Sequence, residues 1–112
     1  MQAPPAGAAT AAGYLRIRNR GQNPDRLLAV STSCAARTEL HLTTIEDGVA
    51  RMRLQRYGIG VPAGGEVAFT PAGFHIMFSS IAEPFRVGER VRLRLTFQHA
   101  GILDIEAPVR AR

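Results

Sequence analysis

Two histidines and two methionines in this sequence have the type and spacing to hold a soft metal ion. His75 and Met77 are separated by one residue, and His41 and Met52 lie upstream with ten residues between them. Imidazole nitrogens and thioether sulfurs are uncharged donors, and the polarisable sulfur favours a soft ion such as Cu(I) over hard cations. The chain contains only three His and three Met, and this pattern uses two of each.

The strand that would carry the second pair follows from simple alternation. Successive side chains of an extended strand point to opposite faces, so Phe74, Ile76 and Phe78 form one apolar face. His75 and Met77 then share the other face, roughly 6.5–7 Å apart. We therefore predict that both donors point away from the core and are accessible to solvent.

The first pair depends on a predicted hairpin. Residues 38–45 alternate as a strand and turn His41 away from the apolar side of that strand. Asp47-Gly48 favours a tight turn because these residues readily adopt the positive φ angles that such a turn requires. The turn brings Met52 back beside the first strand. Alternation leaves Met52 with two interpretations, a ligand or a core side chain, because its neighbours two positions away are apolar.

The rest of the chain shows the same strand-like alternation between turn-forming segments. We expect strands at 13–18, 26–33, 38–45, 49–55, 66–70, 74–80, 91–98 and 103–107. No amphipathic helix of useful length is indicated, and the Gly-rich segment 57–65 lacks the spacing of a phosphate-binding loop. The pattern predicts an all-β Greek-key barrel or sandwich of seven to eight short, mostly antiparallel strands.

Length and composition predict one folded domain. Residues 1–12 are rich in Ala, Pro and Gly and offer little to bury, so we expect a flexible lead followed by a single domain at 13–112. The start of the chain lacks the charged and apolar regions of a signal peptide, and no apolar run is long enough to span a bilayer. Cys34 is the single cysteine, so an internal disulfide is excluded.

Charge suggests two other classes of function. All fourteen basic residues are Arg, and they exceed nine acidic residues to give a net charge of +5. Such a balance favours an acidic partner, nucleic acid or an anionic surface. The arginines fall in rows with a spacing of two, however, as on the solvated faces of strands. The rows are at positions 16, 18 and 20, at 51 and 53, and at 90, 92 and 94. Few aromatics are present to stack on bases. An enzyme is disfavoured, because no motif supplies a base for Cys34.

Several segments between Ala12 and Val109 match the pattern of one known family. The family motif is an H-x10-M pair followed, a little over twenty residues later, by H-x-M. The matching segments are Ala12-Gly13-Tyr14, Asn19-Arg20-Gly21, Pro24-Asp25-Arg26-Leu27, Glu39-Leu40-His41, Gly48-Val49-Ala50-Arg51-Met52-Arg53, Val61-Pro62-Ala63-Gly64-Gly65, Pro71-Ala72-Gly73-Phe74-His75-Ile76-Met77 and Leu95-Thr96-Phe97. With these segments the chain resembles the PCuAC family of periplasmic copper chaperones.

The resemblance implies a function, a fold and a ligand set. It implies a cupredoxin-like β-barrel that binds one Cu(I) through His41, Met52, His75 and Met77, without enzymatic activity. The expected protein is a periplasmic monomer that delivers copper to the Cu(A) site of cytochrome c oxidase subunit II or to a Sco-type assembly factor. The resemblance implies no nucleic-acid partner and no membrane-spanning segment. The alternatives are a metal-free β-sandwich interaction module and an Arg-rich nucleic-acid-binding domain.

Two features depart from the family pattern. Many members have another Met one or two places after the first ligand His, whereas Leu42 and Thr43 follow His41 here. Some members also carry a tail rich in Met and His, whereas this chain closes with Val109-Arg110-Ala111-Arg112. We therefore expect no second copper site on a tail. Cys34 is interpreted as a small buried residue, with a fifth copper donor as the alternative, and His99 lies outside the motif.

Overall fold

The computed structural model describes residues 10–81 and 86–110, which form ten β-strands and no helix within those ranges. The strands are β1 (Thr10–Gly13), β2 (Arg16–Arg18), β3 (Asp25–Ser31), β4 (Ala35–Glu46), β5 (Val49–Leu54), β6 (Ile59–Val61), β7 (Glu66–Ala68), β8 (Phe74–Ile81), β9 (Arg90–Phe97) and β10 (Gly101–Pro108). One sheet has the order β1-β8-β4-β5, a second β10-β9-β3-β6, and β2 pairs with β7. All pairs are antiparallel. The all-β prediction is confirmed, as an open sandwich.

Two strands beyond the predicted eight have identifiable causes. The expected strand at 13–18 divides into β1 and β2, which join different sheets. β6 lies in the Gly-rich segment, where Ile59 and Val61 are buried on either side of exposed Gly60 and pair with β3. A period-two pattern over three residues is too short to recognise among glycines.

The first strand also begins earlier than expected. Thr10, Ala11 and Ala12, assigned to the flexible lead, belong to β1 and pair with Ser79, Phe78 and Met77 of β8. The backbone hydrogen bonds of β8 hold this part of the lead in place. Residues 1–9 of the lead, and residues 82–85 of the loop expected after β8, lie outside the described residues.

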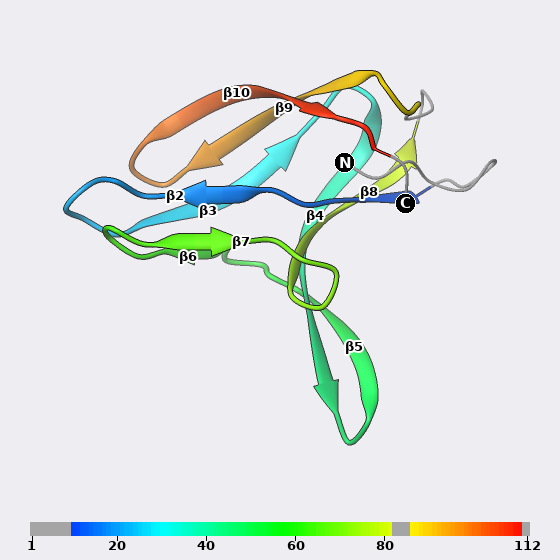
Figure 1. The fold of residues 1–112 in the computed structure, drawn as a ribbon, viewed down its shortest axis with the longest axis horizontal. Coiled ribbons are helices and arrows are strands. Elements are labelled where there is room, and N and C mark those ends of the chain that lie inside the picture. Colours follow the sequence, from blue (N-terminus) through cyan, green and yellow to red (C-terminus); the bar gives the residue numbers. More distant parts are fainter. Residues whose placement is uncertain (1–9, 82–85, 111–112) are drawn as a thin grey trace.

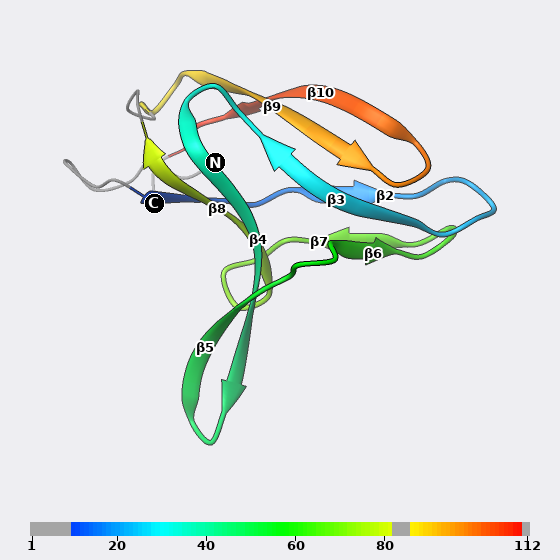
Figure 2. The ribbon, with the colours of Figure 1, turned by 180° about the vertical axis from the view of Figure 1, so that it is seen from behind.

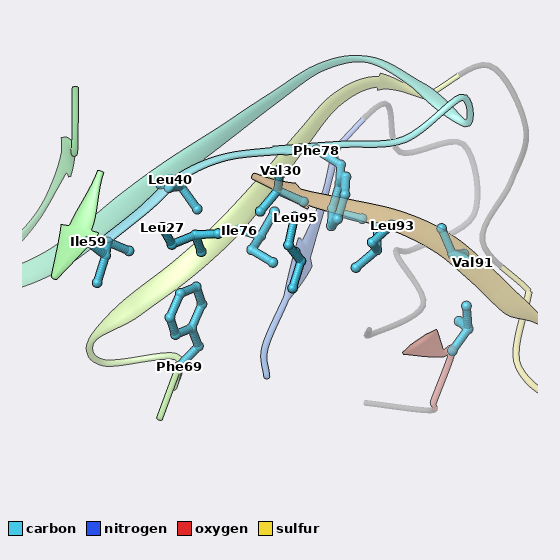
Figure 3. Close-up of a cluster of buried hydrophobic side chains, with 12 residues drawn as sticks. Leu27, Val30, Leu40, Ile59, Phe69, Ile76, Phe78, Val91, Leu93 and Leu95 are labelled. Atoms are coloured by element: carbon cyan, nitrogen blue, oxygen red, sulfur yellow. The ribbon is translucent and has the colours of Figure 1, made fainter. Parts of the chain in front are cut away.

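The core lies between the two large sheets. Figure 3 shows side chains from β3, β4, β8 and β9 meeting in one cluster, among them Leu27, Leu40, Ile76, Phe78 and Leu95. Each of these is at most 5% exposed. Full burial of such a side chain contributes about 1.5–3 kcal/mol. The predicted apolar face of β8 is therefore confirmed at Ile76 and Phe78, and it orients the strand.

The β4–β5 hairpin projects from the body of the sandwich (Figures 1 and 2). Its turn is Asp47-Gly48, with φ angles of 51° and 79°, as the predicted tight turn requires. All six residues of β5 are exposed. β5 is also one of the two edge strands of its sheet. In the part of the chain that the structure describes, no helix is both long and apolar enough to cross a bilayer.

Candidate metal site

The two candidate histidines face each other across β4 and β8. His41 pairs with His75 in the strand register. The ring centroids are 5.6 Å apart and the rings meet edge to face at 66°. Directly paired residues of an antiparallel ladder project to the same face of the sheet. Both imidazoles therefore lie on the face opposite the core side chains of β8.

The two methionines stand on the same face, on either side of the histidine pair. Met77 of β8 pairs with Glu39, and Met52 of β5 pairs with Thr43. Glu39 and Thr43 each lie two positions from His41 on β4, so both methionines are diagonal neighbours of His41. Diagonal neighbours are about 7–8 Å apart, within reach of long side chains. The register therefore puts all four predicted donors on one face.

His75 is buried, which contradicts its predicted accessibility. The side chain is 2% exposed and is the one buried polar residue among residues 10–81 and 86–110. The His75 ring contacts the ring of His41, and its Nδ1 lies 3.3 Å from the carbonyl oxygen of Gly73. A carbonyl can only accept, so Nδ1 carries the proton and donates it. Nε2 is buried without a hydrogen-bond partner.

His41 also keeps one buried nitrogen without a partner. Its Nε2 lies 3.6 Å from Oε1 of Glu39, too far for a hydrogen bond. Nδ1 is buried and has no hydrogen-bond partner. An unsatisfied buried polar group costs about 1–3 kcal/mol. A metal ion bound by one nitrogen of each ring would satisfy both groups.

Met52 is far from the core. Its side chain is 61% exposed, so the core interpretation of this residue is wrong. The apolar neighbours that suggested it, Ala50 and Leu54, are exposed as well, because the hairpin extends beyond the facing sheet. Met77 is half-buried. The solvent exposure of the four candidate donors therefore ranges from the enclosed imidazole of His75 to the open thioether of Met52.

Glu39 and Thr43 belong to the same face but were not predicted as site residues. Glu39 contacts His41, and the Oγ1 atom of Thr43 is buried without a hydrogen-bond partner. Their spacing of two from His41 is the signal that could have identified them. Cys34 lies elsewhere, because the adjacent Ala35 pairs with Ile81, roughly 20 Å along β8 from His75.

The arginine rows lie opposite acidic residues on neighbouring strands. Arg94 contacts Asp104 at 2.9 Å and Arg16 contacts Glu66 at 2.8 Å. Arg94 holds the pKa of Asp104 below its usual range through a side-chain hydrogen bond. These pairs are those expected on solvated strand faces. In the described part of the chain, the acidic partners interrupt the positive charge of these rows.

Comparison with known proteins assigns the chain to a family. A family model described as "Putative lipoprotein LpqE-like" matches residues 1–109. The chain belongs to this LpqE-like family. A lipoprotein relative from Leifsonia xyli subsp. xyli (strain CTCB07) is 26% identical to this LpqE-like chain over 105 residues, which are 94% of the chain and 63% of the relative. The chain thus spans less than two thirds of that relative's length.

Two solved structures share the fold of this LpqE-like chain. The copper-bound PCuAC domain from PmoF2 is 26% identical, with a TM-score of 0.82 over 99% of this chain and 86% of that domain. The Cu(I) form of DR1885 from Deinococcus radiodurans is 28% identical, with a TM-score of 0.78 over 97% of this chain and 72% of that protein. The predicted resemblance to the PCuAC family and its cupredoxin-like fold is confirmed.

Proposed function

We propose that this chain is a copper chaperone that binds one Cu(I) through His41, Met52, His75 and Met77. The observation that carries the proposal is the pair of buried imidazole nitrogens without partners, flanked by two methionines on the same face. The bound copper of the two similar PCuAC structures supports copper as the cargo. PCuAC proteins are copper-binding chaperones and not enzymes.

The donor atoms follow from the hydrogen bonds. In this proposal His75 contributes Nε2, because its Nδ1 donates to Gly73. His41 contributes Nδ1, because its Nε2 faces Glu39. Outer contacts of this kind orient metal-binding imidazoles and select the tautomer. Two neutral nitrogens and two thioethers suit Cu(I), and the lack of a thiolate keeps copper exchangeable.

The exposure of the donors suggests how copper leaves. A receiving protein must add its own ligands before the chaperone's ligands dissociate. Met52 is the open side of the site, whereas His75 is enclosed. Within the hairpin pairs at 41–46 and 49–54, the face around Met52 carries exposed Ile45 and Leu54 and no charged residue. We therefore propose that the receiver approaches along this uncharged face.

The family supports an extracytoplasmic location, since LpqE-like proteins are described as lipoproteins. Within that location we propose the periplasm, with the chain acting as a monomer. The receiver would be the Cu(A) site of cytochrome c oxidase subunit II or a Sco-type assembly factor. These assignments rest on the likeness to PCuAC chaperones.

Anaerobic titration with Cu(I) against a Cu(I)-specific chelator tests the proposal. We expect one Cu(I) per chain, lost in His75→Ala and in Met77→Ile. His99→Ala is the matched control, because His99 lies in the β9–β10 turn outside the site and should leave the affinity unchanged. Failure to retain copper, or equal retention of Zn(II), would contradict the proposal.

A further inference from the structure

An apolar crevice opens at the β2 side of the sandwich, bordered by β9 and β10. It has a volume of about 340 Å³, and its walls include Leu15, Ile17, Leu95, Phe97, Leu103 and Ile105. None of the four candidate copper donors lines it. The crevice is therefore a second feature, distinct from the proposed metal site. Cavities of about 300–1,000 Å³ with mostly apolar walls are typical of small-molecule sites.

Leu103 shows that this part of the core is incompletely covered. It pairs with Leu95, so both side chains point to the inner face of their sheet. Leu95 is 3% exposed, whereas Leu103 is 53% exposed. The gain of about 1.5–3 kcal/mol from burying a leucine is thus not realised in the chain alone. An apolar ligand in the crevice would bury this side chain.

The rim of the crevice carries an excess of positive charge. Arg16, Arg18 and Arg20 line it from β2 and the turn that follows. Glu66 contacts both Arg16 and Arg18, at 2.8 and 3.3 Å. Arg20 has no acidic partner among the described residues. The acid that lines the crevice, Asp25, is occupied as an acceptor of backbone N–H groups.

The contacts of Asp25 hold the part of the rim beside the β9–β10 turn in place. Its carboxylate accepts hydrogen bonds from the backbone N–H groups of Arg26, His99 and Ala100, at 2.7 to 3.0 Å. These bonds tie the start of β3 to the β9–β10 turn. Of the three arginines that line the crevice, Arg16 and Arg18 share their contact with Glu66, and the free guanidinium is that of Arg20.

We propose that the crevice binds a single-chain amphipathic anion. The aliphatic chain would lie against Phe97, Leu103 and Ile105, and its carboxylate or phosphate head would bind Arg20. A guanidinium suits either head, because its fork of donors matches two oxygens at once. The apolar walls would bind the aliphatic chain, and the surplus positive charge at one rim would bind the anionic head. The site is independent of copper binding.

Calorimetric titration of the full chain with dodecanoate, below its critical micelle concentration, tests the proposal. We expect saturable binding of one dodecanoate per chain, and at least tenfold weaker binding of the neutral analogue dodecanol. Parallel titration with dodecyl phosphate distinguishes a free fatty acid from a phosphate-bearing lipid as the source, since the tighter ligand identifies the head. No saturable binding of either anion, or equal affinity for dodecanol, would overturn the proposal.

Two adjacent residues of β10 provide a matched pair of variants. Leu103→Gln places an amide in the apolar wall and should weaken dodecanoate binding about tenfold or more. Ile102→Gln is the control, because Ile102 is 62% exposed and pairs with Thr96 on the outer face. Thermal unfolding checks that both variants fold. If both variants weakened dodecanoate binding equally, binding would depend on general surface hydrophobicity. That result would overturn the proposed site.

A second pair tests the head group. Arg20→Gln should weaken dodecanoate binding while leaving the affinity for dodecanol unchanged. Arg37→Gln is the control, because Arg37 is exposed on β4 and does not line the crevice. Loss of affinity for both ligands in Arg20→Gln would contradict the role of its charge.

Discussion

His75 in its proposed role would serve copper binding at the expense of the stability of the copper-free fold. Its ring is 2% exposed and Nε2 has no hydrogen-bond partner. The carbonyl oxygen of Gly73, which accepts a hydrogen bond from Nδ1, also accepts one from the backbone N–H of Thr43 at 3.0 Å. It would therefore remain satisfied without the imidazole. The loss of stability caused by His75 therefore comes from Nε2, the ring nitrogen that copper is proposed to bind.

His75→Leu should consequently stabilise the copper-free protein while removing copper binding. Removing a buried polar atom without a partner should raise the free energy of unfolding by about 1–3 kcal/mol. Chemical denaturation of the metal-free protein measures this change, and chelator competition measures copper. His99→Leu, an exposed position, is the control and should change neither quantity. A marked loss of stability in His75→Leu would show that the imidazole is structural.

Met52 allows the ligand role to be separated from packing. Because it is 61% exposed, Met52→Leu should leave the free energy of unfolding within about 0.5 kcal/mol of the parent value. The same change removes the thioether and should weaken Cu(I) binding. Chelator competition and thermal unfolding measure the two effects. Undiminished Cu(I) affinity would reduce the proposed site to His41, His75 and Met77.

At the scale of elements, the β4–β5 hairpin has two unlike faces. Within the paired residues 41–46 and 49–54, one face carries His41, Met52 and the exposed Ile45 and no charged residue. Glu39 lies on the same side of β4 but outside these pairs. The other face carries Arg51 and Arg53, which contact Glu46 at 3.3 and 2.8 Å. Strand pairing keeps the two sets apart because side chains alternate. The proposed receiver would meet only the uncharged face.

Ile45→Asp should therefore slow the transfer of Cu(I) to the soluble apo-domain of cytochrome c oxidase subunit II. Burying the new carboxylate against an apolar partner is unfavourable. Val49→Asp is the matched control, since Val49 is 53% exposed near the same tip but belongs to the opposite face. Stopped-flow transfer gives the rates, and chelator competition should show unchanged Cu(I) affinity. Equal rates in both variants would contradict an approach along this face.

At the scale of the whole molecule, Asp25 links β3 to the β9–β10 turn and makes stability depend on pH. Desolvation alone would raise the pKa of Asp25. The backbone N–H groups of His99, Arg26 and Ala100 outweigh it and lower the pKa below its ordinary 3.8. The stabilisation is therefore complete above that ordinary value and is lost as the pH falls through the lower value of the folded protein.

Asp25→Asn should thus be less stable than the parent near neutral pH. The difference should diminish as the pH falls below 3.8, because protonation makes the native carboxyl neutral as well. Urea denaturation across the acid range measures both proteins. Asp47→Asn, in the exposed hairpin turn, is the control and should show no such convergence. A constant difference between Asp25→Asn and the parent at all pH values would contradict the role of the charge.

Local features of the sequence were sufficient to predict most of the strands and the sides on which the candidate donors lie. Alternation identified the face of β8 that carries His75 and Met77, and Asp47-Gly48 identified the hairpin turn, because both signals depend only on neighbouring residues. The sequence did not reveal β6, nor the division of the first strand, because those depend on pairing with distant partners.

Only the tertiary structure determined how the donors relate to one another and to solvent. The pairing of His41 with His75 depends on the register between β4 and β8, which are separated by the hairpin and by β6 and β7. The exposure of Met52 follows from the projection of β5 beyond the facing sheet. Alternation assigns a side chain to one of two faces. Whether that face is covered depends on the elements that pack against it.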